Sequence, residues 1–192
     1  MFSQIIRPAV LMMVVMTVLT GAIYPLVVTG IAQVVFPDKA NGSLIYRDEK
    51  PVGSSLIGQP FDEPRYFRSR PSATGPFPYN AGASSGSNLG PIEPVLTAAI
   101  KARVEALKQA DSGDDAPIPV DLVTASASGL DPHISPAAAE YQVSRVSKAR
   151  SLDEKVVHEL VVKHTEQRTI GLLGEPRVNV VELNLALDHL SP

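Results

Sequence analysis

The hydrophobic pattern of the chain is dominated by one apolar stretch near its N-terminus. No charged side chain occurs between Pro8 and Pro37, where a few threonines, one glutamine and one tyrosine interrupt the aliphatic residues. A hydrocarbon core about 30 Å thick needs roughly 20 helical residues, and in lipid a single segment satisfies its own backbone only as a helix. We therefore predict a transmembrane helix over residues 8–36. The alternatives are a buried core helix and a cleaved signal peptide, although a signal peptide has a shorter apolar region and an A-x-A-like cleavage site.

The charges that flank this stretch indicate its direction of insertion. Arg7 and the N-terminal amine precede the helix, whereas Asp38 and Lys39 after it nearly cancel. The positive-inside rule then places residues 1–7 in the cytoplasm and residues 37–192 outside it. In a double-membrane bacterium, this is a single-pass protein of the inner membrane with a periplasmic domain.

Small residues inside the apolar stretch suggest a neighbouring helix. Thr17 and Gly21 are four residues apart and share a helix face, and small residues allow another helix to approach closely. The alternative is a helix alone in lipid. Because the stretch holds no ionisable residue, we do not expect it to carry ions by itself.

Beyond residue 37, the pattern predicts short strands and helices in mixed order. The expected elements are, in chain order, a β-hairpin of strands 43–47 and 54–57, an irregular segment 58–91, a helix 92–109, a strand 120–125, a turn 126–132, helices from Ser135 to about 149 and from Ser151 to about 164, an extended segment 178–181 and a helix 182–190. Apolar residues at helical spacing support the helices. Ser135 before Pro136 predicts an N-cap, and Ser151 with Glu154 predicts a capping box. Without strict βαβ alternation, this order indicates an α+β fold, a single mixed α/β extracytoplasmic domain.

The irregular segment 58–91 is rich in Gly and Pro, yet it contains half of the Phe and Tyr residues of the chain. Disordered segments are poor in aromatics, so we expect an ordered segment with packed aromatic rings. Arg65, Tyr66, Phe67 and Arg70 lie together in it. Because Arg and aromatic residues anchor interfaces, these four are candidates for a partner-facing patch, with a solvated loop as the alternative.

Composition narrows the chemistry that the chain can perform. The absence of cysteine excludes disulfides, thiolate zinc sites, thiol nucleophiles and a lipoprotein anchor. The net charge of −3 argues against a nucleic-acid partner. His158 and His164 would lie about 240° apart on a helix, so we expect no metal site.

The turn at residues 126–132 is the main candidate for chemistry. Ser126, Ser128, Asp131 and His133 lie close in the sequence. Without a G-x-S-x-G elbow, a capped turn is a simpler interpretation than a hydrolase triad. The same turn, with Gly129, offers backbone donors that could hold a phosphate, although it matches no established phosphate-binding motif.

Many short segments of the chain together resemble one family. They are Asn41-Gly-Ser-Leu-Ile45, Ser55-Leu-Ile-Gly-Gln59, Tyr66-Phe67, Arg70-Pro-Ser-Ala73, Tyr79-Asn80, Gly86-Ser-Asn-Leu89, Asp121-Leu-Val-Thr-Ala-Ser126, Ser128-Gly-Leu-Asp131, Ile134-Ser-Pro-Ala-Ala-Ala139, Gln142-Val, Arg145-Val, Lys148-Ala-Arg150 and Val178-Asn-Val-Val-Glu-Leu-Asn-Leu-Ala-Leu187. With the N-terminal membrane helix, they resemble the C subunit of the Kdp-type potassium-transporting P-type ATPase, the KdpC family. The resemblance covers nearly the whole chain.

The resemblance implies an accessory subunit of a high-affinity, ATP-driven potassium uptake pump. Its implied partners are a channel-like potassium subunit, a P-type ATPase subunit, a small single-helix subunit and membrane lipid. The C subunit is described as a catalytic chaperone that raises the ATP affinity of the hydrolysing subunit and has no hydrolytic site of its own. Gln142 matches by position a glutamine linked to nucleotide contact, near Ser126, Ser128 and Gly129. The resemblance thus implies no tightly bound cofactor, with ATP shared with the hydrolysing subunit.

The implied nucleotide contact conflicts with the expected topology. ATP is cytoplasmic, whereas the flanking charges place Gln142 outside, and one domain cannot face both compartments. Within the family, the alternative is a domain over the outer mouth of the potassium subunit that assists assembly or ion access. Outside the family, a membrane-anchored periplasmic enzyme or a ligand-binding module would also fit the anchor.

Overall fold

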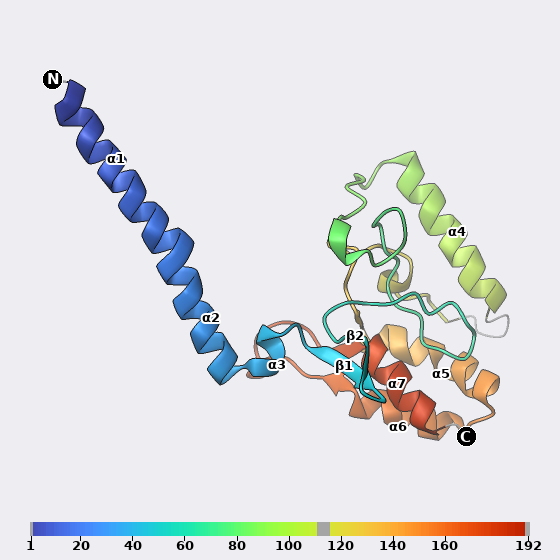
Figure 1. The fold of residues 1–192 in the computed structure, drawn as a ribbon. Helices are drawn as coiled ribbons and strands as arrows, with labels where there is room; N and C mark the ends of the chain where they lie inside the picture. The colour runs from blue at the N-terminus through green and yellow to red at the C-terminus, as the bar shows by residue number, and fades with distance from the viewer. Residues whose placement is uncertain (1, 111–115, 191–192) are drawn as a thin grey trace. The chain divides into compact units, whose positions relative to one another are not determined.

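The computed structural model describes residues 2–110 and 116–190 of the 192-residue chain (Figure 1). The chain divides into two compact units, with the boundary between Ser54 and Ser55. The first unit contains the apolar helix, a short helix after it and a β-hairpin, and the second contains the other helices and a small sheet. Residues 37–54, which we expected to belong to the water-facing domain, thus group with the apolar helix.

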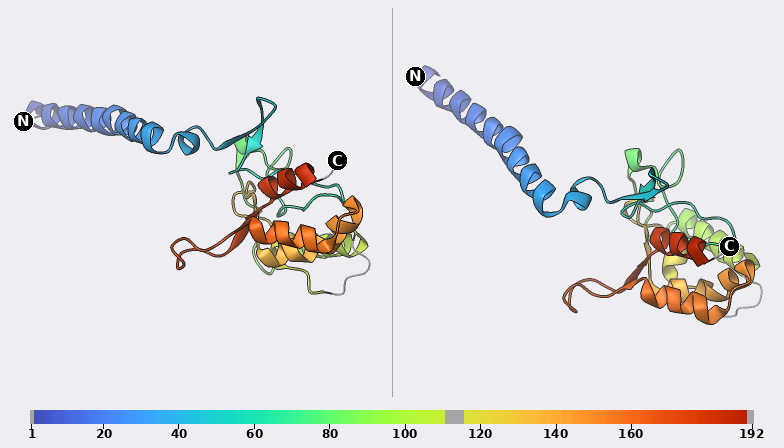
Figure 2. Two further views of the ribbon diagram at one scale, coloured as in Figure 1. Left: turned by 90° about the horizontal axis from the view of Figure 1, so that it is seen from below. Right: turned by 60° about the horizontal axis from the view of Figure 1, so that its bottom comes forward.

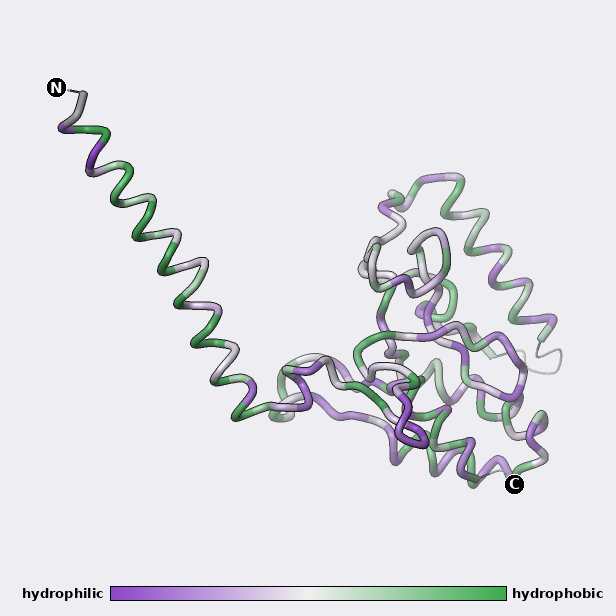
Figure 3. The backbone as a smooth tube through the Cα atoms, viewed as in Figure 1, coloured by the Kyte–Doolittle hydropathy of each residue, from purple (hydrophilic) through white to green (hydrophobic). Residues whose placement is uncertain are grey.

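The apolar helix begins earlier than the sequence pattern predicts. It consists of α1 (Phe2–Val18), a π turn η1 (Leu19–Ile23) and α2 (Tyr24–Val35), and the short helix α3 (Pro37–Ala40) follows. Hydrophobic residues cover most of its length (Figure 3). Among the described residues, Gln4–Val35 is the one helix long and apolar enough to cross a membrane. Its 32 residues extend about 48 Å at 1.5 Å per residue, so the helix exceeds a hydrocarbon core of about 30 Å.

The β-hairpin of the first unit is tighter than expected. Strands β1 (Leu44–Arg47) and β2 (Lys50–Ser54) pair antiparallel, so the second strand lies before the predicted 54–57. The prediction was wrong because Asp48 and Glu49 alone form the turn, with φ of 49° and 64°. Two successive residues with positive φ make the mirror-image turn that matches the twist of a hairpin.

The second unit is built on a three-stranded sheet in the order β3 (His133–Ile134), β5 (Arg177–Asn179), β4 (Thr165–Glu166), with both pairs antiparallel. Helices α5 (Pro136–Arg150), α6 (Glu154–Lys163) and α7 (Val180–Leu190) pack together beside it. Helix α4 (Pro94–Ala110) confirms the helix expected at 92–109. The mixed order of short strands and helices confirms the expected α+β class.

The prediction of a strand at residues 120–125 is wrong. This stretch instead forms a 3₁₀ turn, η3 (Val120–Leu122). The Asp121 carboxylate accepts hydrogen bonds from the Ser135 backbone N–H (2.6 Å) and hydroxyl (3.2 Å), and the Thr124 hydroxyl donates to the Val120 carbonyl at 2.7 Å. These side-chain bonds stabilise a turn in competition with a strand ladder.

The capping prediction holds for α5 and fails for α6, and the last helix begins earlier than expected. Ser135 caps α5, since its Oγ accepts from the Ala138 backbone N–H at 3.0 Å. Ser151 instead ends α5 in the left-handed region with φ 54°, and Asp153 caps α6. Asn179 ends β5 because its Oδ1 accepts from two backbone N–H groups at 3.1 and 3.2 Å, so helix α7 starts at Val180 rather than at 182.

The irregular segment 58–91 is ordered, with one short 3₁₀ turn, η2 (Ala81–Ala83). Phe67 is fully buried, and the rings of Phe61 and Tyr66 lie 5.4 Å apart. The expectation of packed aromatics is confirmed for these three, whereas Phe77 is 56% exposed.

Two side-chain amides hold the backbone of this segment where a strand would otherwise be needed. The Asn184 amide of α7 accepts from the Phe67 N–H and donates to the Phe67 carbonyl, both at 2.9 Å. The Gln142 amide of α5 binds Arg68 by the same pattern: it accepts from the Arg68 N–H at 2.8 Å and donates to the Arg68 carbonyl at 3.2 Å. Each amide thus supplies the donor and acceptor that a neighbouring strand would supply.

Two arginines of α5 complete this arrangement. Arg145 donates to the carbonyls of Pro64 and Tyr66, and Arg150 donates to the carbonyl of Arg65 at 2.7 Å. Five consecutive carbonyl groups, 64–68, are therefore bound by side chains of α5 and α7. We call the set of Gln142, Arg145, Arg150 and Asn184 the backbone clamp.

Removal of one clamp amide should lower the stability of the second unit. Asn184→Ala leaves the Phe67 N–H and carbonyl without partners, and each such buried group costs about 1–3 kcal/mol. We expect the free energy of unfolding of the full-length chain in detergent, measured by circular dichroism in urea, to fall by roughly 3 kcal/mol. The control Gln109→Ala, on an exposed position of α4, should change it by less than about 0.5 kcal/mol. Equal stability of the two variants would contradict the clamp.

Candidate functional site

Gln142, the residue linked by resemblance to nucleotide contact, is buried in the middle of α5 with 1% of its surface exposed. Besides its two bonds to Arg68, it accepts from Arg145 Nη2 at 2.6 Å and donates to the Ala138 carbonyl at 3.1 Å. A carboxamide offers two donor hydrogens and one acceptor oxygen with two lone pairs, so all its capacity is used. Nucleotide contact by Gln142 would therefore require these bonds to be exchanged.

The turn with Ser126, Ser128 and Gly129 packs closely against the irregular segment. The Ser126 Oγ accepts from the Gly129 N–H at 2.9 Å, and the Ser128 Oγ accepts from the Leu130 N–H at 3.1 Å. Gly129 has φ +67°, and a Cβ added there would lie 2.6 Å from the Ser85 carbonyl oxygen. Two backbone donors that could hold a phosphate are thus already engaged, and a side chain at Gly129 has no room.

The candidate partner-facing residues occupy different environments. Two guanidinium groups lie near the Tyr66 ring, with Arg65 Cζ at 5.2 Å and Arg150 Cζ at 4.9 Å from the ring centroid. All three side chains meet Asp188, which is 2.8 Å from Arg150 Nη2 and 3.6 Å from Arg65 Nη2 and accepts from the Tyr66 hydroxyl at 3.3 Å. Burial raises the pKa of Asp188, but the hydrogen bonds from Arg150 and Tyr66 and the charges of Arg150 and Arg65 together hold the pKa below its usual value.

Phe67, by contrast, belongs to the hydrophobic core. Its side chain has no exposed surface, and its backbone is held by Asn184. In this conformation it can contact no partner, while the Arg65 side chain beside it is 48% exposed.

A second ionic group is centred on Asp131 and includes Arg70. Arg70 Nη1 lies 3.4 Å from Asp131 Oδ2, and His133 Nδ1 lies 3.2 Å from Asp131 Oδ1. Partial burial raises the pKa of Asp131, but hydrogen bonds from His133 and the nearby charges of His133 and Arg70 together lower it below its usual value. The hydroxyls of Ser126 and Ser128 accept bonds from the backbone of their own turn, an arrangement typical of a structural turn.

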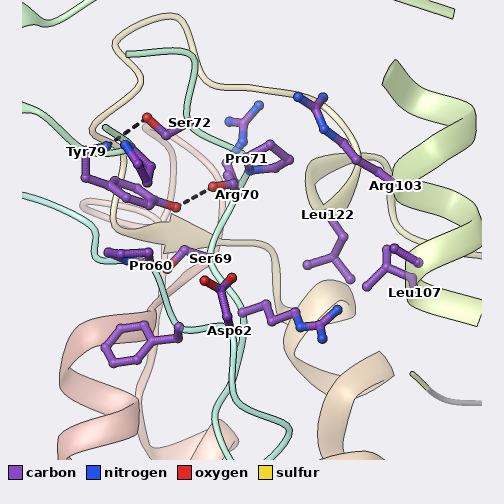
Figure 4. Close-up of a pocket in the computed structure, with 14 residues that line it drawn as sticks. Pro60, Asp62, Ser69, Arg70, Pro71, Ser72, Tyr79, Arg103, Leu107 and Leu122 are labelled. Atoms are coloured by element: carbon purple, nitrogen blue, oxygen red, sulfur yellow. Dashed lines mark hydrogen bonds between the residues drawn. The ribbon is translucent and has the colours of Figure 1, made fainter. Parts of the chain in front are cut away.

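A pocket of about 270 Å³ lies between the irregular segment, helix α4 and turn η3 (Figure 4). Tyr79 forms one side, where its backbone N–H donates to Ser72 Oγ at 2.9 Å and its hydroxyl donates to the Arg70 carbonyl. Burial raises the pKa of Tyr79 to about 12, so the phenol stays protonated. The guanidinium groups of Arg70 and Arg103 lie at the same end of the pocket in Figure 4, away from the Asp62 carboxylate.

Arginines give this pocket its chemical character. Arg68, Arg70 and Arg103 line it, and the Nε atoms of Arg68 and Arg70 are buried without a hydrogen-bond partner among the described residues. A guanidinium binds carboxylates and phosphates through such donors. The pocket could therefore accept a small anionic group, and Gln142 fixes the backbone of Arg68, one of its walls.

The remaining sequence candidates lie elsewhere. Thr17 is in α1 and Gly21 in the π turn η1, so their four-residue spacing no longer equals one α-helical turn. Within residues 2–110 and 116–190, no three His, Asp or Glu side chains are placed to hold a metal ion.

Comparisons with known proteins place the chain in a family. The model of the family described as "K+-transporting ATPase, c chain" matches residues 6–189. The chain belongs to the KdpC family. A protein named potassium-transporting ATPase KdpC subunit from Methylococcus capsulatus is 64% identical over 96% of this chain and 97% of its own. Proteins with the same name from Polaromonas naphthalenivorans and Herpetosiphon aurantiacus are 62% and 63% identical, over 99% and 96% of this chain and 97% and 95% of their own.

Sequence reasoning on this KdpC chain missed several residues that shape the site. Asn184, Arg150 and Arg103 lie far in sequence from the segments they hold. Asn184 carried one local signal, since it is a polar residue on the apolar stripe of α7. The sequence around Arg103 gave no such signal, because an arginine on an amphipathic helix usually faces solvent.

The ionic group around Asp131 should make stability depend on acid pH. The pKa of Asp131 is lower in the folded state than its reference value of 3.8. Its contribution is therefore present above that value and is lost as pH falls through the folded pKa. We expect Asp131→Asn to lower the thermal unfolding temperature of the full-length chain at pH 7, with the difference from wild type shrinking as pH falls below about 4. A difference that grows at acid pH would contradict this assignment.

Proposed function

We propose that the chain is a membrane-anchored accessory subunit of a potassium-transporting P-type ATPase, acting in assembly and stabilisation of the complex without a hydrolytic site of its own. The observation that carries the proposal is the KdpC family membership over residues 6–189. The apolar helix Gln4–Val35 supports membrane anchoring. Its proposed partners are the potassium channel-like subunit, the ATPase subunit and a small single-helix subunit.

The proposed orientation places the N-terminus in the cytoplasm and the second unit outside. Arg7 lies in the first turns of the helix, and no other Lys or Arg precedes Lys39. The positive-inside rule favours this direction. An outside domain cannot contact cytoplasmic ATP, so an effect on ATP affinity would reach the hydrolysing subunit through protein contacts as an allosteric coupling.

The proposed chaperone role, which raises the ATP affinity of the hydrolysing subunit, therefore assigns Gln142 a positioning task. Gln142 holds the backbone of Arg68, and Asn184 holds that of the preceding Phe67 by the same pattern. Both are buried carboxamides on helices that pack on the same segment. Asn184 is thus a matched control for Gln142 within the same chain.

Cysteine labelling tests the orientation, because the chain contains no cysteine. We expect Lys101→Cys, on an exposed position of α4, to react with a membrane-impermeant maleimide in intact spheroplasts. Gln4→Cys, at the start of the apolar helix, should react only after the spheroplasts are lysed. The reversed pattern would place the domain in the cytoplasm and restore direct ATP contact.

The matched amide pair tests the role of Gln142. We expect Gln142→Ala and Asn184→Ala both to lower the thermal unfolding temperature, since each leaves buried backbone groups unpaired. In the purified complex, both should change the KM for ATP in the same direction and to a similar extent. A KM increase confined to Gln142→Ala, with unfolding temperature unchanged, would instead indicate direct nucleotide contact. If the wild-type chain does not co-purify with an ATPase subunit at all, the accessory function itself is wrong.

A further inference from the structure

The pocket between the irregular segment, helix α4 and turn η3 carries an excess of positive charge. Arg68, Arg70 and Arg103 line it against one carboxylate, that of Asp62, which leaves the lining with a formal net charge of +2. Asp131, 3.4 Å from Arg70 Nη1, offsets one of these charges. The arm that continues strands β4 and β5 projects from the body of the second unit (Figure 2) and contributes no residue to the lining. The charge excess therefore belongs to the body of this unit.

Arg68 is the arginine whose side chain the fold itself does not use. Its backbone N–H and carbonyl are bound by Gln142. Its guanidinium has no hydrogen-bond or ion-pair partner among residues 2–110 and 116–190, and its Nε is buried. A polar group that is withdrawn from water without a partner costs free energy. An unsatisfied group of this kind in a native structure points to a bound ion or water.

Arg70 and Arg103 direct their guanidinium groups to one short stretch of backbone. Arg103 Nη1 donates to the Val123 carbonyl at 2.9 Å, and Arg70 Nη2 donates to the Ala125 carbonyl at 3.4 Å. The two guanidinium groups lie at the same end of the pocket (Figure 4). Arg103 has no carboxylate partner among the residues that the structure describes. Because like charges repel each other, this end of the pocket favours an anion.

The fold fixes these arginines before any ligand binds. Gln142 binds both backbone groups of Arg68, and the Tyr79 hydroxyl donates to the Arg70 carbonyl. The Val123 carbonyl holds the guanidinium of Arg103. Such preorganisation lowers the entropic cost of binding. The pocket volume of about 270 Å³ lies below the range of about 300–1,000 Å³ typical of pockets for larger organic ligands, so it suits a small ion.

We propose that this pocket binds a free phosphate ion, held by the guanidinium groups of Arg68, Arg70 and Arg103. A phosphate group carries a charge of about −1.5 to −2 at pH 7 and three strong acceptor oxygens, so it can accept from arginines of different chain segments at once. A carboxylate offers two oxygens, which suits a single guanidinium. The small volume favours the free ion over a nucleoside triphosphate. The accessory function does not depend on this site.

Calorimetric titration of the full-length chain in neutral detergent with inorganic phosphate tests the site. Arg68→Gln removes the guanidinium and keeps the backbone groups that Gln142 binds. We expect it to weaken phosphate binding about tenfold, the loss typical of a hydrogen bond to a charged group. The control Lys101→Gln removes one positive charge from an exposed position of α4 outside the lining and should bind phosphate as wild type does. Equal binding by all three proteins, or none beyond that of chloride at equal ionic strength, would overturn the proposal.

Thermal unfolding separates a ligand site from a structural role of Arg68. Without phosphate, Arg68→Gln should unfold at the wild-type temperature or above it, because the guanidinium has no partner in the described fold. With phosphate in excess it should unfold below wild type, since a ligand stabilises the folded state that binds it. A lower temperature for Arg68→Gln in both conditions would overturn the proposal. So would ATP or acetate stabilising wild type more than phosphate does at equal concentration. The accessory function stands in each case.

Discussion

The second unit depends on the pairing of side-chain amides and guanidinium groups with the backbone of residues 64–68. A buried irregular segment leaves its N–H and carbonyl groups without a ladder, and each unpaired group costs free energy. Here α5 and α7 supply the missing partners, with Gln142 and Asn184 each binding both polar groups of one residue. The polar side chains on these helices allow an irregular chain to cross a hydrophobic core.

The same pairing places the walls of the pocket. Arg68 follows Phe67 directly, so when Phe67 is fixed in the core, the Arg68 side chain is directed to the pocket. Tyr79 then holds the Arg70 carbonyl on the other side of Ser69. A change at Gln142 would therefore alter Arg68 without any ligand touching the glutamine. In the proposed orientation, with the domain outside the compartment of ATP, this is a physical route by which the glutamine could influence distant events.

The sequence predicts features that depend on local rules. The apolar stretch, the Ser135 cap with Pro136 and the stripe of α4 all follow from spacing within a few residues. The failures come from competition between local and distant partners. Val120–Ala125 has strand-forming residues, but Asp121 bonds Ser135 fourteen residues away and closes a turn. Ser151 has the capping-box spacing, but it forms the C-cap of α5 in the left-handed region and so does not cap the next helix. The clamp could not be predicted, because its contacts span 74 to 117 residues.

The π turn at Leu19–Ile23 has a consequence for how one helix meets its surroundings. Such a turn accommodates one extra residue compared with an α-helix, and one residue corresponds to a rotation of about 100° around the helix axis. The side chains of α2 are therefore rotated relative to the pattern set by α1. The helix face that α1 presents to a neighbouring helix is therefore not aligned with the corresponding face of α2. A single span can in this way turn different faces toward different neighbours at two depths of the same bilayer.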